Sequence, residues 1–162
     1  MTSERDVGIS ISRAENNDIP NIIKIALELN LSFWSKADYE LELTNKDGIF
    51  LVAKEKINEQ TIGFMVARLI MPSTNHFAEI YNIGVTLQFQ RNSVGKHLIS
   101  ELLILCHKRD ISEIWLEVRS LNNSALEFYK SIGFIVSDKR KNFYNNPVDD
   151  AFVLSYEVLH IN

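Results

Sequence analysis

The chain has 162 residues, 46% of them hydrophobic and 23% charged, a balance that excludes a disordered chain and fits one folded domain over residues 1–162. Lysine and arginine number 17 against 21 aspartates and glutamates, so the formal net charge is −4. This mild acidity excludes a general attraction to nucleic acid or to anionic membranes, and any phosphate site must therefore be local.

The first half of the chain predicts a strand, two helices and a hairpin. Residues 7–13 alternate between apolar and polar side chains, which indicates a half-buried strand. Asp18-Ile19-Pro20 is typical of a cap and a helix start, and the inner face of that helix would carry Ile22, Ile23, Ala26 and Leu27. Ser35 to Asp38 resembles a capping box that opens a short second helix. Strands over 49–54 and 61–70 would then form the hairpin.

The second half predicts strands and helices in alternation, followed by two closing strands. The expected elements are a strand over 76–85, a helix over 94–109, a strand over 114–119, a helix over 124–132, and strands over 134–140 and 151–158. We therefore expect an α/β fold, a single mixed β-sheet with helices on both of its faces. The strands 76–85 and 114–119 are joined through a helix, so they should be parallel.

The segment from Gln90 to Lys96 lies where a predicted strand leads into a helix. A helix start presents unpaired backbone N–H groups and the positive end of the helix dipole, which is a ready anion site. Arg91 and Lys96 add two cations. The segment is not a Walker loop, because no glycine stands five residues before Gly95, and it has no GxGxxG pattern. Taken alone, such a segment is more often an ordinary solvated helix start.

Five motifs follow one another in the second half of the chain: Gln90-x-x-Ser93-x-Gly95, Leu116-Glu117-Val118-Arg119, Asn122-x-x-Ala125-x-x-Phe128-Tyr129-x-x-x-Gly133-Phe134, Arg140-Lys141-Asn142-Phe143-Tyr144 and Asp150-Ala151. Together they resemble the GCN5-related N-acetyltransferase (GNAT) superfamily. Within it they are similar to the RimI-type branch, which acetylates ribosomal-protein alanine and other protein N-termini. The resemblance covers roughly residues 49–158 through motifs, and residues 7–48 only through element order and Phe33-Trp34-Ser35.

The resemblance implies that acetyl-CoA is the co-substrate and that one loop cradles its pyrophosphate, formed by Gln90, Arg91, Asn92, Ser93, Val94, Gly95 and Lys96. It also implies that the strand 76–85 diverges from its neighbour, so that Ile83 to Val85 offer free N–H and C=O groups to the pantetheine arm. The Val85 N–H would be an oxyanion donor, and Gly84 would ease a bulge. Glycine is usual in the family where Ser93 stands. A positive φ there would cost Ser93 on the order of 1 kcal/mol, unless its hydroxyl caps the helix or binds phosphate.

The implied reaction is direct attack of an amine on the thioester, which needs a base for the amine and an acid for the leaving thiolate. Tyr129 matches the general acid of the family, and Asn122, two helical turns earlier, matches its pantetheine contact. Two glutamates compete for the role of base. Glu117 matches the RimI-type base and Glu79 that of the histone-acetylating branch, and either needs a raised pKa. The alternatives are solvated strand glutamates and a core tyrosine.

By resemblance, the acceptor binds between the loop that carries Phe33 and Trp34 and the hairpin that carries Tyr144, whose hydroxyl would bind the peptide backbone. Phe33 replaces a usual proline, and the segment 142–148 is short. A protein N-terminal α-amine is favoured, because freeing it at pH 7 costs about 1.1 kcal/mol, against about 4.6 kcal/mol for a lysine. Two alternatives stay open: a small-amine acetyltransferase acting on a polyamine, an amino acid or an antibiotic, and a non-catalytic sensor of acetyl-CoA.

The remaining residues predict no further chemistry. The one cysteine, Cys106, excludes an intrachain disulfide and is expected in the core. The four histidines have no ligand spacing, so no metal is expected. No apolar run approaches about 18 residues, and the charged N-terminus lacks a secretory h-region. We expect a soluble, cytoplasmic protein without membrane or nucleic-acid partners, and the sequence leaves its oligomeric state open.

Overall fold

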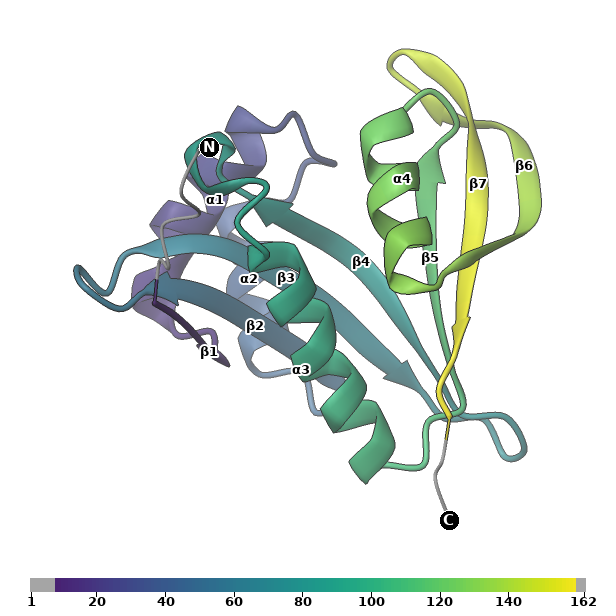
Figure 1. Cartoon of the computed structure of the whole chain (residues 1–162), viewed down its shortest axis with the longest axis horizontal. Helices are drawn as coiled ribbons and strands as arrows, with labels where there is room; N and C mark the ends of the chain where they lie inside the picture. Colours follow the sequence, from purple (N-terminus) through teal and green to yellow (C-terminus); the bar gives the residue numbers. More distant parts are fainter. Residues whose placement is uncertain (1–7, 160–162) are drawn as a thin grey trace, which may run out of the picture. The chain divides into compact units, whose positions relative to one another are not determined.

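The computed structural model describes residues 8–159, and its elements follow the predicted order (Figure 1). They are β1 (Ile9–Arg13), η1 (Asn16–Asp18), α1 (Ile19–Glu28), α2 (Lys36–Leu43), β2 (Gly48–Glu55), β3 (Thr61–Ile70), β4 (Phe77–Val85), η2 (Leu87–Phe89), α3 (Val94–Lys108), β5 (Glu113–Arg119), α4 (Asn123–Ile132), β6 (Ile135–Asn145) and β7 (Val148–Glu157). The seven strands of the mixed sheet are ordered β1-β2-β3-β4-β5-β7-β6. Val7, the first residue of the first predicted strand, lies outside the described residues.

The chain forms two compact units. The first contains the residues up to Arg68 together with Asn82–Ile104, and the second contains Leu69–Tyr81 together with the residues from Leu105 onward. β4 and α3 therefore each contribute residues to both units. That residues 1–162 act as one domain stays a prediction.

The first unit has a core of helical and strand side chains. β2 pairs antiparallel with β1 and with β3. The buried residues of the core in this unit are Ile19, Ile22, Ile25, Tyr39, Phe50, Val52, Phe64 and Val66. The predicted inner face of α1 was partly wrong, because Leu27 is 69% exposed. The inner stripe repeats every three residues from Ile19 through Ile25, and a residue two positions further on points away from it.

The starts of α1 and α2 differ in how well they were predicted. The capping box of α2 is confirmed: the Asp38 N–H donates to Ser35 Oγ at 3.2 Å, and the Ser35 N–H donates to Asp38 Oδ2 at 2.6 Å. Asp18 is the N-cap residue of α1 and the helix begins at Ile19, as predicted, but the Asp18 side chain makes no capping hydrogen bond. Its buried carboxylate instead accepts from the Thr61 hydroxyl at 2.8 Å and pairs with Lys54 Nζ at 2.9 Å. These strand partners neutralise and satisfy a charge that the local sequence assigns to a cap.

The second unit confirms the parallel pairing of β4 and β5. The pairing runs from Phe77↔Glu113 to Ile80↔Leu116. β7 then pairs antiparallel with β5 and with β6. Side chains alternate along β5, so Ile114, Leu116 and Val118 are buried, whereas the intervening residues are half-buried on the other face.

β6 is longer than predicted, because the chain keeps pairing through a bulge. The register runs from Arg140↔Ala151 to Tyr144↔Asp149, so β6 spends two more residues than β7 on this stretch. Asn142 has a φ of 50° there, and its N–H donates to Asp150 Oδ1 at 2.8 Å. The segment 142–148 is therefore mostly strand, and only Asn146-Pro147 forms the turn.

Candidate active site

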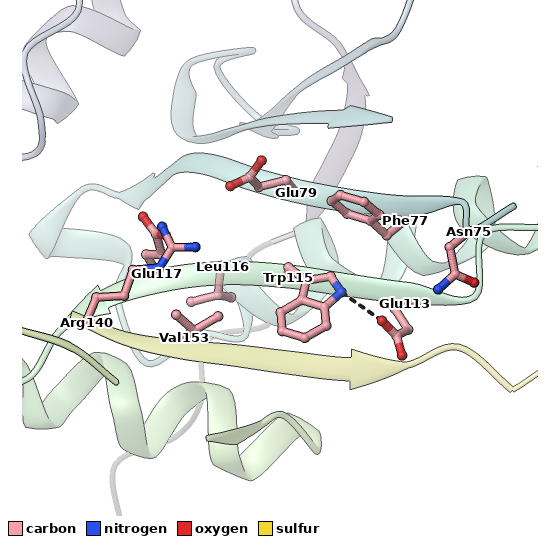
Figure 2. Close-up of a pocket in the computed structure, with 9 residues that line it drawn as sticks. All are labelled: Asn75, Phe77, Glu79, Glu113, Trp115, Leu116, Glu117, Arg140 and Val153. Carbon is pink, nitrogen blue, oxygen red and sulfur yellow. Dashed lines mark hydrogen bonds and ion pairs between the residues drawn. The ribbon is translucent and has the colours of Figure 1, made fainter. Parts of the chain in front are cut away.

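A groove on the second unit brings the two candidate bases together (Figure 2). Its volume is about 420 Å³, and it is lined by Asn75, Phe77, Glu79, Glu113, Trp115, Leu116, Glu117, Arg140 and Val153. Glu79 lies on β4 and Glu117 on β5. Both carboxylates lie on one face because Glu79 is in register with Trp115, two residues before Glu117. Glu117 and Arg140 lie at one end of the groove, and Asn75 and Glu113 lie at the other.

Glu117 is partly buried in the groove. Its side chain is 20% exposed, and its Oε1 lies 2.5 Å from Nη1 of Arg140. Burial raises the pKa of Glu117, the Arg140 guanidinium lowers it, and the charge of Glu79 raises it again, with a net rise above the usual glutamate value. A carboxylate with a raised pKa is a better proton acceptor near neutral pH.

Glu79 has a different partner. The hydroxyl of Tyr81, two residues further along the same face of β4, donates to Glu79 Oε2 at 2.7 Å. The hydrogen bond orients this carboxylate in the groove. Glu79 and Glu117 thus share one groove but are held by different groups.

Tyr129 lies in α4 and is 6% exposed. Its ring packs edge-on against Phe128 and Phe134, with centroids 5.1 and 5.5 Å away. Burial raises the pKa of Tyr129, and the charge of Tyr144 adds to that rise. The phenol therefore keeps its proton over the whole physiological range, as a general acid requires.

Asn122 is the N-cap of α4. Its side-chain Oδ1 accepts a hydrogen bond from the Ala125 N–H at 3.1 Å. The carbonyl end of this side chain is thus used by the helix, and the amide NH₂ is the end that can donate to a ligand. The predicted contact to pantetheine would have to use this NH₂ group.

Tyr144 lies on β6, close to the turn into β7. The guanidinium of Arg119 stacks on its ring, 4.2 Å from the centroid, and donates to the carbonyls of Pro147 and Asn146 at 2.8 and 3.1 Å. Arg119 thus ties the end of β5 to the turn and fixes the ring of Tyr144. Burial and the charge of Glu117 raise the pKa of this tyrosine.

The predicted pyrophosphate loop lies in the first unit, between η2 and α3. Arg91 and Ser93 both have a φ of 61°, so Ser93 stands in a left-handed conformation that glycine adopts more readily. Val94, Gly95 and Lys96 form the first turn of α3. Left-handed residues before a helix turn backbone N–H groups into a concave anion site, which fits a pyrophosphate.

Polar side chains stabilise this loop from within. Gln90 donates through Nε2 to the Val85 carbonyl at 3.0 Å, and Asn92 donates through Nδ2 to the Gln90 carbonyl at 3.0 Å. The Val85 carbonyl, expected to be free for the pantetheine arm, is therefore already engaged. Gln90 thereby connects the loop to the end of β4, the segment that carries Ile83 and Val85.

Gly84 serves close packing. A Cβ at this position would lie 2.9 Å from Leu29 Cδ1 and 3.0 Å from Leu31 Cδ1. The sequence suggested that a glycine here eases a bulge, but the structure accounts for it by the approach of these two leucines to β4.

Phe33 and Trp34 belong to the loop before α2, also in the first unit. They line a pocket of about 270 Å³ together with Asp38, Leu41, Glu42 and Arg68. Phe33 is 84% exposed. Trp34 contacts Tyr39, with ring centroids 5.4 Å apart, and the Arg68 guanidinium lies 5.8 Å from its ring. Glu42, itself buried, holds Arg68 through an ion pair of 2.7 Å.

Two arginines of this arrangement, Arg119 and Arg140, were not singled out from the sequence. Both stand inside quoted motifs, Leu116 to Arg119 and Arg140 to Tyr144. For Arg119 the available signal was a cation two residues from a candidate base on the same strand. Arg140 gave no such signal, because β7 lies between its strand and that of Glu117.

Residues 8–159 contain no group of three histidine, cysteine or acidic side chains placed to hold a metal ion. Over the same residues, no helix is long and apolar enough to cross a membrane.

The fold is that of an acetyl-CoA-dependent acetyltransferase. The sequence model of the Acetyltransferase (GNAT) family matches residues 19–134, and the chain therefore belongs to this family of N-acetyltransferases, which use acetyl-CoA as co-substrate.

Individual relatives are more specific. The chain is 31% identical over 137 residues to the [ribosomal protein bS18]-alanine N-acetyltransferase of Haemophilus influenzae, covering 85% of this chain and 88% of the relative. It is 26% identical over 151 residues to the enzyme of the same name from Escherichia coli K12, covering 92% and 97%. The crystal structure of the Escherichia coli ribosomal-protein-S18-alanine N-acetyltransferase has a TM-score of 0.81 at 24% identity, over 95% of this chain and 96% of that chain.

Proposed function

We propose that this protein transfers the acetyl group of acetyl-CoA to the α-amino group of a protein N-terminus. The observation that carries the proposal is the groove in which Glu79 and Glu117 meet, since the reaction needs a base beside the acceptor amine. The relatives described above are named as alanine N-acetyltransferases of ribosomal protein bS18, which supports a protein acceptor. In this proposal residues 1–162 act as one domain. The protein works in the cytoplasm, where acetyl-CoA and newly made N-termini are both present.

In the first unit, the backbone of Arg91 to Lys96 binds the pyrophosphate, and the Arg91 and Lys96 side chains add positive charge. Ile83 and Val85 hold the pantetheine arm, and the Val85 N–H donates to the thioester oxygen as negative charge develops on it. Gln90 acts indirectly, through its hydrogen bond to the Val85 carbonyl. Ser93 keeps the turn at a positive φ.

In the second unit, Glu117 accepts the proton that the acceptor ammonium gives up, and Glu79 is the second carboxylate of the relay. The amine then attacks the thioester carbon, the carbon–sulfur bond breaks, and Tyr129 gives its proton to the thiolate. The Asn122 amide steadies the pantetheine arm. Tyr144 binds the acceptor backbone. Phe33 and Trp34, which belong to the first unit, are the other residues proposed to bind the acceptor.

The energetics favour an α-amine over a lysine. Deprotonation at pH 7 costs about 1.1 kcal/mol for an α-amine and about 4.6 kcal/mol for a lysine side chain. The pKa of Glu117 is raised, but its ion pair with Arg140 opposes that rise. A carboxylate whose pKa is raised only against the opposing effect of Arg140 suits the deprotonation of an α-amine better than that of a lysine.

The test is a turnover screen that follows thiol release with three acceptor classes: peptides with a free N-terminus, lysine peptides with a blocked N-terminus, and small amines. We expect turnover with the first class, and we expect Glu117→Gln to lose most of it. Glu127→Gln, an exposed change on α4, is the charge-matched control. Turnover confined to small amines, or wild-type rates for Glu117→Gln, would overturn the acceptor or the base respectively.

A further inference from the structure

The closest charged contact in the groove joins Glu117 to Arg140. The motifs of the sequence assign no role to Arg140. The two side chains approach to 2.5 Å, and they are 20% and 54% exposed respectively. The Arg140 guanidinium also lies 5.6 Å from the centroid of the Phe143 ring. The guanidinium therefore lies over an aromatic ring and pairs with the carboxylate at the same time. Figure 2 shows the pair at one end of the groove.

The register of three strands places this arginine on the same face of the sheet as Glu117. Arg140 pairs in register with Ala151, and Glu117 pairs with Val153, so their strands flank β7 from its two sides. The bulge begins directly after Arg140 and is held by Asp150, which accepts from the Asn142 N–H at 2.8 Å and pairs with Lys139 at 3.0 Å. A bulge raises the local twist and redirects the side chains at its ends. Arg140 can thus reach across β7 to β5.

Few charged or titratable groups face Glu117 from the elements packed against it. They are Arg140 and Tyr144 from β6 and Glu79 from β4, while Val153 faces it from β7. Arg140 is the cation of this set, and it opposes both burial and the repulsion from Glu79. Without Arg140, a half-buried carboxylate beside another carboxylate would bind its own proton more tightly. In that protonated state Glu117 could not accept a proton from the acceptor ammonium.

We propose that Arg140 is a positioning residue for the base: it keeps the Glu117 carboxylate ionised and aimed into the groove until the acceptor ammonium arrives. The inference rests on the proposed role of Glu117. As the ammonium N–H bond breaks, the proton forms an O–H bond on Glu117, and Arg140 loses its anionic partner. The ion pair re-forms when Glu117 releases that proton to solvent after transfer, so Arg140 also restores the base for the next cycle.

The direct test is an NMR titration of the glutamate side-chain carboxyl carbons, with the Glu117 signal assigned by its absence in Glu117→Gln. We expect Arg140→Met to raise the pKa of Glu117, moving its midpoint by about tenfold in proton concentration. Arg140→Lys keeps the charge and should restore most of the wild-type midpoint. Lys141→Met is the matched control, because this exposed neighbour loses the same charge without touching Glu117.

The kinetic test compares kcat/KM of Arg140→Met with that of wild type across pH, since this ratio cancels the ionisation of the acceptor itself. We expect the ratio to be lower at pH 6 than at pH 8.5, by at most the roughly tenfold shift of the Glu117 midpoint. A ratio that is constant with pH would indicate a structural role and overturn the proposal. So would a Glu117 midpoint that moves no more in Arg140→Met than in Lys141→Met.

The two experiments also separate this inference from the proposed function. If Arg140→Met does not fold, Arg140→Gln and Arg140→Lys give the same comparison, and the proposal fails if these two variants share one Glu117 midpoint. If Glu117→Gln turns over at the wild-type rate, Glu117 is not the base and the proposed function is wrong at that residue. The NMR titration needs no turnover, so it still reports whether Arg140 holds the carboxylate ionised.

Discussion

Tyr129→Phe separates chemistry from packing more cleanly than any other change in this protein. The ring is 6% exposed and packs edge-on against Phe128 and Phe134 at 5.1 and 5.5 Å. Phenylalanine keeps all of that packing. The Tyr129 hydroxyl makes no hydrogen bond within residues 8–159, so the substitution strands no partner and should change the free energy of unfolding by less than about 0.5 kcal/mol.

Catalysis should respond quite differently, because the substitution removes the proton that the departing thiolate needs. Loss of a general acid costs about 10²-fold in rate, or about 2.7 kcal/mol in the activation barrier. Burial raises the pKa of Tyr129, so the phenol stays protonated throughout the neutral pH range. The defect should therefore be the same on both sides of neutral pH, and the binding of acetyl-CoA should be unchanged.

The assay is single-turnover thiol release with a colorimetric thiol reagent, together with urea unfolding. The reagent should not react with the folded enzyme itself, because Cys106 is buried and its pKa is raised to about 12. Tyr156→Phe is the matched control, since that ring also packs on Phe134, with centroids 5.3 Å apart. A Tyr129→Phe rate within about threefold of wild type, or an equal loss in both variants, would refute the assignment of Tyr129 as the acid.

The other predictions concern the loop, the hairpin and the base. Acetyl-CoA should raise the melting temperature of the wild type but not of Gly95→Asp, whose added charge faces the pyrophosphate; a normal shift in the variant would show that the loop is misassigned. Ser93→Gly should bind acetyl-CoA as tightly as wild type or more tightly, because φ is 61° at this position, and a loss above about tenfold in isothermal titration would instead implicate the hydroxyl. Arg119→Met should raise KM for a peptide acceptor several-fold more than it lowers kcat, since its bonds to the turn and its stacking on Tyr144 position the acceptor side; an unchanged KM counts against that role. The pKa of Glu117 is raised, so activity should rise with pH through a midpoint above the usual glutamate range, and the ratio of Glu117→Gln to wild type should fall with pH through that midpoint.

Local sequence rules predicted the elements whose determinants are local. The Ser35 to Asp38 box opens α2 because both of its hydrogen bonds close within four residues. The parallel pairing of β4 and β5 followed from the helix between them, which excludes a tight hairpin. Alternation along β4 and β5 likewise accounts for Glu79 and Glu117 lining one groove. In each case the deciding interaction lies within one element or follows from the connection between two.

The errors occur where a distant partner decides. Asp18 stands at the predicted N-cap position, yet its carboxylate contacts Lys54 and Thr61 and does not cap the helix. These residues are far along the chain, so no local pattern could reveal them. Leu27 was placed inward by counting from Ile22 and Ile23, but the stripe that packs on the sheet runs through Ile19, Ile22 and Ile25. A helix of ten residues with several apolar positions allows both faces, and only the surface it meets selects one.

The candidate site shows the same division at the level of chemistry. Motifs identified Glu117 and Tyr144, because each is recognisable from its immediate neighbours. The partnership of Glu117 with Arg140 is different, since it depends on a third strand between them and on a bulge that the sequence hides as an ordinary polar stretch. That bulge depends in turn on Asp150, which accepts the Asn142 N–H. The pairing of β6 with β7 therefore influences the charge state of the proposed base. A substitution at Asp150, which lies outside the groove, should change the pKa of Glu117 through Arg140.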